Sequence, residues 1–206
     1  MKILYSLTPC CVINPYRCCL LSKMSEITRM DEWQRIGQIL DGKRNEYAWF
    51  VNTYSQQVLD FTSRMVSNAE DAKELAQDAF VKAFRSLSSF RGQSSFCTWV
   101  CRIAYHESLN LLKRRGPHYV DIEDLSAVED EELSTGREER ILLMEESIDN
   151  LSPDERMLIH LYYYEDRPLR EIAYIMDAES GTLATRLHRI RKKLLRMIKQ
   201  KEKDNE

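Results

Sequence analysis

An all-α fold is what this sequence predicts, and three observations support the prediction. Glycine and proline, which interrupt helices, number only 6 and 5 among 206 residues. Apolar residues recur at spacings of three and four along much of the chain, as on the buried face of an amphipathic helix. Alternating apolar and polar residues, which would indicate strands, are nearly absent. A chain of this length can bury a core as one domain or as two small ones.

Residues 1–23 differ in composition from the rest of the chain. They hold four of the six cysteines together with Pro9 and Pro15, and they have no helical period. Polar residues interrupt the apolar run and no small-residue cleavage site follows, so a signal peptide is poorly matched. A metal site on the adjacent cysteine pairs is a weaker alternative, because such pairs lack the usual ligand spacing. The six cysteines of the chain do not form a credible disulfide framework. We expect an extension without fixed structure or a misassigned start, with Met24 or Met30 as the true one.

Three amphipathic helices are predicted between residues 31 and 87. The first ends at Gly42, and one face carries Trp33, Ile36, Ile39 and Leu40. The second runs from about 45 to 66, with an inward face of Tyr47, Phe50, Val51, Tyr54, Val58 and Phe61. The third is capped by Asn68. Its outer face is charged, and its buried face comprises Ala72, Leu75, Ala76, Ala79, Phe80, Ala83, Phe84 and Leu87.

A turn-like run at residues 90–95 leads into a further helix with a basic end at Lys113, Arg114 and Arg115. Aromatic rings stack on unpaired bases while Lys and Arg hold phosphates, so this stretch suits an unstacked nucleic acid. On composition alone, an ordinary amphipathic helix with a buried tryptophan fits equally well. Cys97 and Cys101 lie at i and i+4, and small buried thiols are a better interpretation than a metal pair.

Charge is distributed unevenly along the second half of the chain, although the formal net charge is only −3. Gly116-Pro117 breaks the preceding helix. Residues 116–140 hold nine acids against two arginines, whereas residues 182–201 hold eight Lys or Arg and no acid. The acidic stretch has no regular ligand spacing, so a flexible linker is favoured over a metal-binding cluster.

A second helical domain is predicted over residues 141–202. Its first helix keeps Ile141, Leu142, Met144, Ile148 and Leu151 at helical spacing, and residues 152–155 form a complete helix start signal. A short helix from Pro168 with Leu169, Ile172, Ala173 and Met176, a turn at 177–180 and a last helix from about Gly181 make a helix-turn-helix. The last helix has a basic face opposite an apolar stripe, and a helix of this kind after a tight turn fits a DNA major groove. The stripe comprises Leu183, Leu187, Ile190 and Leu194.

Three stretches resemble the sigma-70 family, and in particular its small extracytoplasmic-function members. Residues 77–83 resemble the phrase Q-[DE]-[AV]-F-x-[KR]-[AV] of sigma region 2. Residues 169–194 are similar to the helix-turn-helix of sigma region 4. The block F-R-G-x-S-x-F-x-T-W-L-x-R-I-A-x-N of region 2 is matched by Phe90, Arg91, Gly92, Ser94, Phe96, Thr98, Trp99, Arg102, Ile103 and Ala104.

The resemblance implies three sets of binding residues. The helix before residue 86 would dock on the largest subunit of RNA polymerase through Gln77, Asp78, Phe80, Lys82 and Arg85. The loop 90–96 would capture a flipped base of the −10 promoter element, and the −10 set comprises Phe90, Arg91, Gln93, Ser94, Ser95, Phe96, Arg102, His106, Asn110, Lys113 and Arg114. The last helix would meet the −35 element through Thr182, Thr185, Arg186, His188, Arg189 and Lys192.

Three places depart from the family pattern, and one of them, Arg167-Pro168 in place of the common S-Y, changes a helix cap but hardly the fold. His106 stands where many members have Asn, so we expect an altered or lost base contact there. Ala184 replaces a basic residue, which removes one contact and changes the expected −35 preference.

The function that the resemblance implies is that of a sigma factor, which binds core RNA polymerase, recognises the −35 and −10 elements of promoter DNA and promotes strand opening. A further implied partner is an anti-sigma factor, often membrane-anchored. The domain division is 24–115, a linker at 116–140, and 141–202. We expect a cytoplasmic protein, not itself a membrane protein, because no run of eighteen apolar residues exists. No cofactor, metal or catalytic site is expected, since no phosphate-loop, H-E-x-x-H or G-x-S-x-G motif occurs.

Two other classes of protein remain as alternatives. A stand-alone helix-turn-helix regulator would bind an operator without polymerase, typically as a dimer on two half-sites. An α-helical enzyme would use paired carboxylates within residues 129–132, although such a polar, uncapped run makes a poor catalytic frame.

Overall fold

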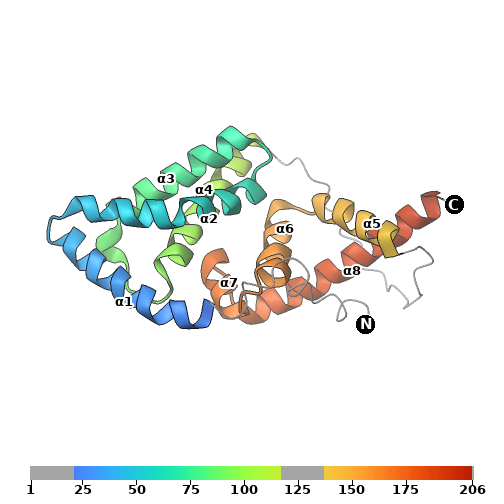
Figure 1. The fold of residues 1–206 in the computed structure, drawn as a ribbon. Helices are drawn as coiled ribbons and strands as arrows, with labels where there is room; N and C mark the ends of the chain where they lie inside the picture. The colour runs from blue at the N-terminus through green and yellow to red at the C-terminus, as the bar shows by residue number, and fades with distance from the viewer. Residues whose placement is uncertain (1–20, 117–136, 206) are drawn as a thin grey trace.

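The fold is all-α, as the sequence predicts, and its helices form two groups (Figure 1). This computed structural model describes residues 21–116 and 137–205, with side chains placed over 31–116 and 141–202. Within those ranges there is no strand. The first group comprises α1 Leu21–Leu40, α2 Tyr47–Met65, α3 Ala69–Arg85 and α4 Phe96–Arg115. The second comprises α5 Arg137–Asp149, α6 Pro153–Ile159, α7 Leu169–Met176 and α8 Ser180–Asn205.

Local sequence accounts for where the helices of the first group begin and end. The Asn68 side chain accepts hydrogen bonds from the backbone N–H groups of Glu70 at 2.8 Å and Asp71 at 3.2 Å, which confirms the predicted cap of α3. Ser95 caps α4 through the N–H of Thr98 at 3.1 Å. At the other end α4 stops before Gly116, whose φ of +84° is easily reached only without a side chain. The helices α2, α3 and α4 then pack pairwise around one aromatic core.

The first helix begins earlier than predicted and ends, as predicted, just before Gly42. It begins at Leu21, so residues 21–23, which the sequence assigned to an unstructured extension, are helical. Residues 1–20 and the linker residues 117–136 lie outside the described residues. Ile36 and Ile39 are buried as predicted, whereas Trp33 is 47% exposed and Leu40 55% exposed. Spacing alone cannot tell which residues at the margin of an apolar stripe find a neighbour to cover them.

In the second group, α6 begins with a capping box. The Ser152 hydroxyl accepts from the Glu155 N–H, and the Glu155 carboxylate accepts from the Ser152 N–H, with Pro153 at the first position. The helix then widens into a π-helical turn at His160–Tyr164, which the sequence did not predict. Helix α7 ends at Asp177 in the left-handed conformation, and this short turn leads directly into α8.

Helix α5 presents the predicted face only in part: Met144 and Ile148 are half-buried against the core, and Leu151, just beyond the helix, is 2% exposed. Leu143 is 7% exposed, whereas Ile141 and Leu142 are 44% and 65% exposed. Only α8 packs extensively on this helix, so its buried stripe is narrow. The predicted stripe of α8 is confirmed, because Leu183, Leu187, Ile190 and Leu194 are all buried.

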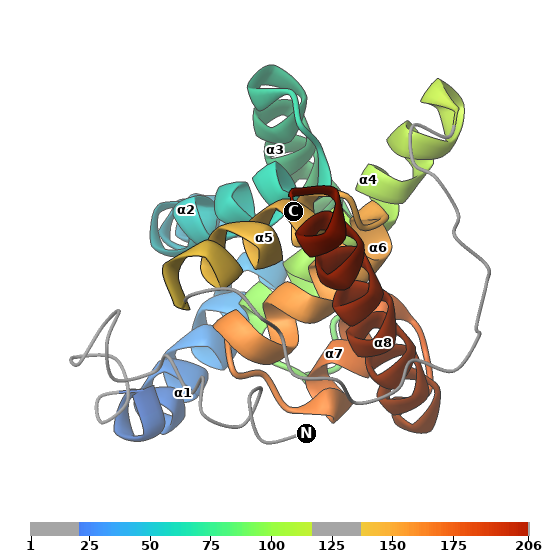
Figure 2. The ribbon, with the colours of Figure 1, turned by 90° about the vertical axis from the view of Figure 1, so that its right-hand side faces the viewer.

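The two groups are packed against each other. Helix α7 lies on the N-terminal half of α4, and α6 lies beside α2. In the end-on view of Figure 2 the C-terminal end of α4 projects away from the second group, and α8 runs across that group's outer side. The first half of α4 is therefore an interface between the groups, while its basic end is not.

Candidate nucleic-acid interface

The loop 90–96 is built on a buried aromatic floor. Phe90 and Phe96 are 9% and 0% exposed, and both rings contact Trp99, at centroid distances of 5.0 and 5.9 Å. The prediction that Trp99 packs in the core is confirmed. The two phenylalanines, which the sequence assigned to DNA binding, point into the protein, where their rings pack in the aromatic core. Their role in this structure is to hold the loop.

Between these anchors the loop presents polar groups. Arg91 and Gln93 are exposed, and Ser94 and Ser95 are half-buried. The Ser95 hydroxyl is also within hydrogen-bonding distance of the Thr98 hydroxyl, at 2.8 Å. A guanidinium group, an amide and hydroxyls at this turn can meet both a phosphate and the edge of a base.

The predicted DNA face of α4 is divided in two. Asn110, Lys113 and Arg114 are exposed on the projecting end of the helix. Arg102, by contrast, donates to the backbone carbonyl of Tyr174 and to the Asp177 carboxylate, the latter at 2.6 Å, and its guanidinium lies 4.9 Å from the Tyr174 ring centroid. The structure therefore does not bring the four predicted residues to one open surface.

His106, the departure from the family pattern, is half-buried beside Tyr105, with ring centroids 5.5 Å apart.

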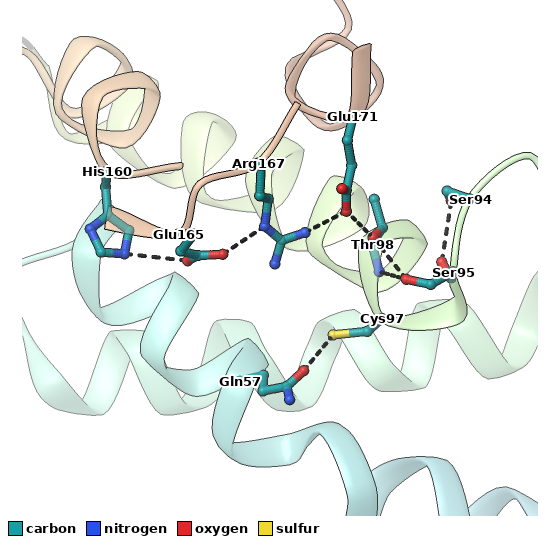
Figure 3. Close-up of polar contacts among 9 residues, drawn as sticks. All are labelled: Gln57, Ser94, Ser95, Cys97, Thr98, His160, Glu165, Arg167 and Glu171. Carbon is teal, nitrogen blue, oxygen red and sulfur yellow. Dashed lines mark hydrogen bonds and ion pairs between the residues drawn. The ribbon is translucent and has the colours of Figure 1, made fainter. Parts of the chain in front are cut away.

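A chain of ion pairs in the second group ends in a hydrogen bond to the first group where α7 meets α4 (Figure 3). Arg167 lies between two carboxylates, Glu165 at 2.6 Å and Glu171 at 2.8 Å. Glu171 also accepts a hydrogen bond from the Thr98 hydroxyl at 2.6 Å, and His160 lies 3.3 Å from Glu165. Burial by itself raises the pKa of Glu165, but the hydrogen bond from His160 and the charge of Arg167 outweigh burial and lower that pKa to about 2.

The two cysteines of α4 lie under this contact, and the prediction that they are buried free thiols is confirmed. The Cys97 thiol donates to the Gln57 side-chain oxygen at 3.2 Å (Figure 3). A hydrogen bond with Cys97 and burial both raise the pKa of Cys101. Over the ranges 31–116 and 141–202, no three His, Cys, Asp or Glu side chains are grouped so that they could hold a metal ion.

Asp154, in the first turn of α6, joins a residue from each group. It accepts a hydrogen bond from the Tyr105 hydroxyl of α4 and forms an ion pair with Arg186 of α8. Arg186, which the sequence assigned to the −35 set, is half-buried, and its guanidinium group is paired with Asp154 inside the protein.

The other predicted residues of α8 lie on one open face. Thr182, Thr185, His188, Arg189 and Lys192 are all exposed, and each lies on the side of the helix away from its buried stripe. The face follows a short helix and a tight turn, so it has the geometry of a recognition helix that enters a major groove.

The outer face of α3 is exposed at Gln77, Asp78, Lys82 and Arg85. Lys82 forms an ion pair with Glu107 of α4 while remaining 48% exposed. Phe80 differs from the other residues of the predicted docking set, because its side chain is buried in the core and only 6% exposed. Its backbone carbonyl accepts a hydrogen bond from the Tyr47 hydroxyl at 2.7 Å. It supports the helix and presents no surface to a partner.

The sequence did not point to the carboxylates that hold the basic residues, namely Asp154, Glu171 and Asp177. Their nearest signal is that each stands at the start or end of a helix in the second domain. Trp33 and Glu32 of α1, which contact the loop 90–96, were also missed.

The fold and the exposed faces define a two-part helical DNA-recognition protein, and known proteins give the class. Residues 50–118 match the family Sigma-70 region 2, and residues 141–194 match Sigma-70, region 4. The RNA polymerase sigma-H factor of Pseudomonas aeruginosa is 31% identical over 178 residues, 80% of this chain and 92% of that protein. The ECF RNA polymerase sigma-E factor of Escherichia coli strain K12 is 33% identical over 170 residues, 76% of this chain and 88% of that protein.

Two solved structures share the fold at lower identity. The sigma factor RpoE of Bartonella quintana, in complex with the anti-sigma factor NepR, has a TM-score of 0.54 at 22% identity and covers 75% of this chain and 97% of its own. CnrH in complex with the cytosolic domain of CnrY has a TM-score of 0.55 at 18% identity, with 81% and 96% covered.

The chain belongs to the sigma-70 family. Within that family it is an extracytoplasmic-function sigma factor, a protein that directs promoter-specific initiation by RNA polymerase. Its helices in the ranges 21–116 and 137–205 include none that is long and apolar enough to cross a membrane.

Proposed function

We propose that this sigma factor divides promoter recognition between its two open surfaces. The exposed face of α8 reads the −35 element as duplex through Thr182, Thr185, His188, Arg189 and Lys192, with Arg186 at its margin. The loop 90–96 and the basic end of α4 hold the −10 element after its strands separate, through Arg91, Gln93, Ser94, Ser95, His106, Asn110, Lys113 and Arg114. The observation that carries this proposal is the exposure of a polar and basic face on α8 directly after a helix-turn-helix turn.

Core RNA polymerase is the partner that brings the two surfaces to one promoter. The outer face of α3, with Gln77, Asp78, Lys82 and Arg85, is the docking surface in this proposal, and its exposure supports it. Residues 24–115 and 141–202 act as the two domains and 116–140 as their linker. The protein works in the cytoplasm with no catalytic site or cofactor of its own.

An anti-sigma factor is the proposed further partner. The sigma factor RpoE, which shares this fold, was solved in complex with the anti-sigma factor NepR, and CnrH was solved in complex with the cytosolic domain of CnrY. In this chain the contact between α4 and α7 holds Arg102, which the sequence assigned to the −10 set, so a partner that stabilises this contact would hold the protein inactive.

The proposal is tested by reconstitution with core polymerase. We expect co-purification with the core enzyme and run-off transcription from a subset of a promoter-fragment library that shares one −35/−10 pair. Asp78→Ala should weaken the complex with polymerase, whereas Arg189→Ala should leave the complex intact and reduce initiation. A protein that ignores polymerase and binds a symmetric site tightly by itself would be a stand-alone regulator, and the proposal would be wrong.

A further inference from the structure

Trp33 is a large aromatic side chain that the core does not enclose. It is 47% exposed, whereas Ile36 and Ile39 on the same helix are 2% and 6% exposed. Single exposed apolar residues are common on protein surfaces, so exposure alone assigns no role. The position of Trp33 against the loop 90–96 is the second observation.

The loop lies directly on the indole ring. The rings of Trp33 and Phe90 are stacked, with centroids 5.6 Å apart and planes 29° from parallel. A Cβ built on Gly92 would lie 2.0 Å from Cζ2 of Trp33, and Gly92 has a φ of +66°. Glycine at this position therefore meets two demands, a left-handed backbone and close approach to the ring. The tryptophan forms one wall of the loop.

The neighbouring residue in α1 fixes the far end of the same loop. The Glu32 carboxylate, 4% exposed, accepts hydrogen bonds from the Tyr54 hydroxyl and from the Phe96 N–H, the latter at 3.5 Å. Phe96 is the first residue of α4, so the carboxylate also lies at the positive end of that helix. Two consecutive residues of α1 thus hold the loop at its middle and at its end, and a rigid wall costs little ordering entropy when a ligand binds.

The groups around the ring suit an unpaired nucleotide. Arg91 and Gln93, on either side of Gly92, are exposed and can reach a phosphate and a base edge. An exposed indole beside such groups offers a base a π-face on which to stack. We propose that the exposed part of Trp33 is a stacking surface for one base of the unpaired promoter strand held by the loop 90–96. This inference rests on the proposed function, which places the −10 strand at this loop.

The test uses holoenzyme and a fluorescent non-template oligonucleotide that carries the −10 element found by run-off transcription. Trp33→Ala should weaken strand binding about 5- to 150-fold, the range for loss of one base–aromatic stack. Trp33→Phe should restore most of the affinity. Leu40→Ala is the matched control, because Leu40 is 55% exposed on the same helix, seven residues further on, and should leave binding unchanged.

A cycle with abasic oligonucleotides separates stacking from support of the loop. In wild-type holoenzyme, removal of the one stacked base should weaken binding about as much as Trp33→Ala does. In the Trp33→Ala holoenzyme, the same abasic site should cause no further loss, while abasic sites elsewhere add to the effect. Losses that add at every position would show that the ring only supports the loop and would overturn the inference.

A second cycle checks the geometry without DNA. Gly92→Ala should lower the melting temperature of the free chain, and it should lower it less in the Trp33→Ala background, where the added methyl no longer meets a ring. An equal loss in both backgrounds would contradict the placement of the ring. A Trp33→Ala holoenzyme that binds the strand within twofold of wild type overturns the inference alone, whereas a wild-type holoenzyme that binds no strand overturns the proposed function with it.

Discussion

The two helices that the proposal brings to DNA, α4 and α8, differ in what lies against them. On α8 every predicted contact residue except Arg186 is exposed. On α4 the basic end is exposed, but Arg102 is held by the carbonyl of Tyr174 and the carboxylate of Asp177. The difference teaches that a carbonyl and a carboxylate of the second domain hold a basic residue of α4 that the sequence assigned to DNA binding. DNA that bound Arg102 would have to displace these groups, whereas on α8 only Arg186, among the predicted residues, has such an ion-pair partner within the part of the chain that the structure describes.

The largest expected effect is on stability, from a change on the buried side of α8. Leu183 is 0% exposed, and Leu183→Ala should lower the free energy of unfolding by about 2–5 kcal/mol, because it leaves a cavity beneath the recognition face. Urea unfolding followed by circular dichroism measures the loss. Thr182→Ala, next to it and exposed, is the control and should change stability by less than about 0.5 kcal/mol. Equal effects of the two changes would mean that the helix is rotated from its described position.

The ion pairs of the second domain, which lie next to the contact with α4, should make stability depend on acid pH through Glu165. Its pKa in the folded chain is about 2, below the reference value of 4.5, so its carboxylate stabilises the folded state above pH 4.5. That stabilisation, up to about 3 kcal/mol, is lost as the pH falls from 4.5 toward 2. Glu165→Gln should reduce stability at pH 7 and flatten this part of the profile in urea unfolding. The exposed Glu179, changed to Gln, serves as the control; a profile that stays as steep in Glu165→Gln as in wild type would exclude this carboxylate as the cause.

The open face of α8 is tested by Arg189→Ala. If Arg189 contacts a base, Arg189→Ala should weaken the apparent binding of the cognate promoter by about 1–3 kcal/mol and so reduce initiation. It should also weaken the preference for one particular base at one −35 position. Run-off transcription on single-base variants of the −35 element measures both. Arg170→Ala, an exposed arginine on α7, should change neither. A uniform loss over all −35 variants would instead make Arg189 a phosphate contact.

The smallest effect is expected at the covered half of α4. Asp177 is 61% exposed and its ion pair with Arg102 is partly open to water, so Asp177→Asn should loosen the domain contact by less than about 1 kcal/mol. Energy transfer between dyes on the two domains should show a modest shift toward separated molecules, and binding of non-specific DNA by the free chain should rise slightly. Asp166→Asn, another exposed acid of the second domain, is the control, and an unchanged transfer signal in Asp177→Asn would show that the pair does not hold the contact.

Much of the fold follows from local sequence. The caps at Asn68 and Ser152, the stop at Gly116 and the stripe of α8 each depend on a few neighbouring residues, and all were predicted. The exposed contact faces of α3 and α8 were predictable for the same reason, because the opposite side of an amphipathic helix faces water.

The misses depend on contacts between distant parts of the chain. Whether Trp33 is buried depends on the loop near Gly92, and Arg102 is covered only because α7 lies against α4. The burial of Phe90 and Phe96 was masked by a family pattern that names residues without saying which way they point; the burial of Phe80 was predicted from helical spacing, although the family pattern also assigned it to docking. The π-helical turn at His160–Tyr164 was also missed, and no residue pattern in this stretch predicted it.

The buried thiols of Cys97 and Cys101 offer a way to measure how often this domain contact opens. Both are buried, and Cys101 lies close enough to Arg167 and Glu165 for their charges to act on it. A thiol reagent reaches Cys101 only in molecules whose domains have parted, so its rate of labelling, divided by the rate for a free thiol, gives the fraction of open molecules. With Cys97 and the four cysteines at 10, 11, 18 and 19 replaced by serine, that ratio would report how often an unbound sigma factor samples the open arrangement, before polymerase or promoter is added.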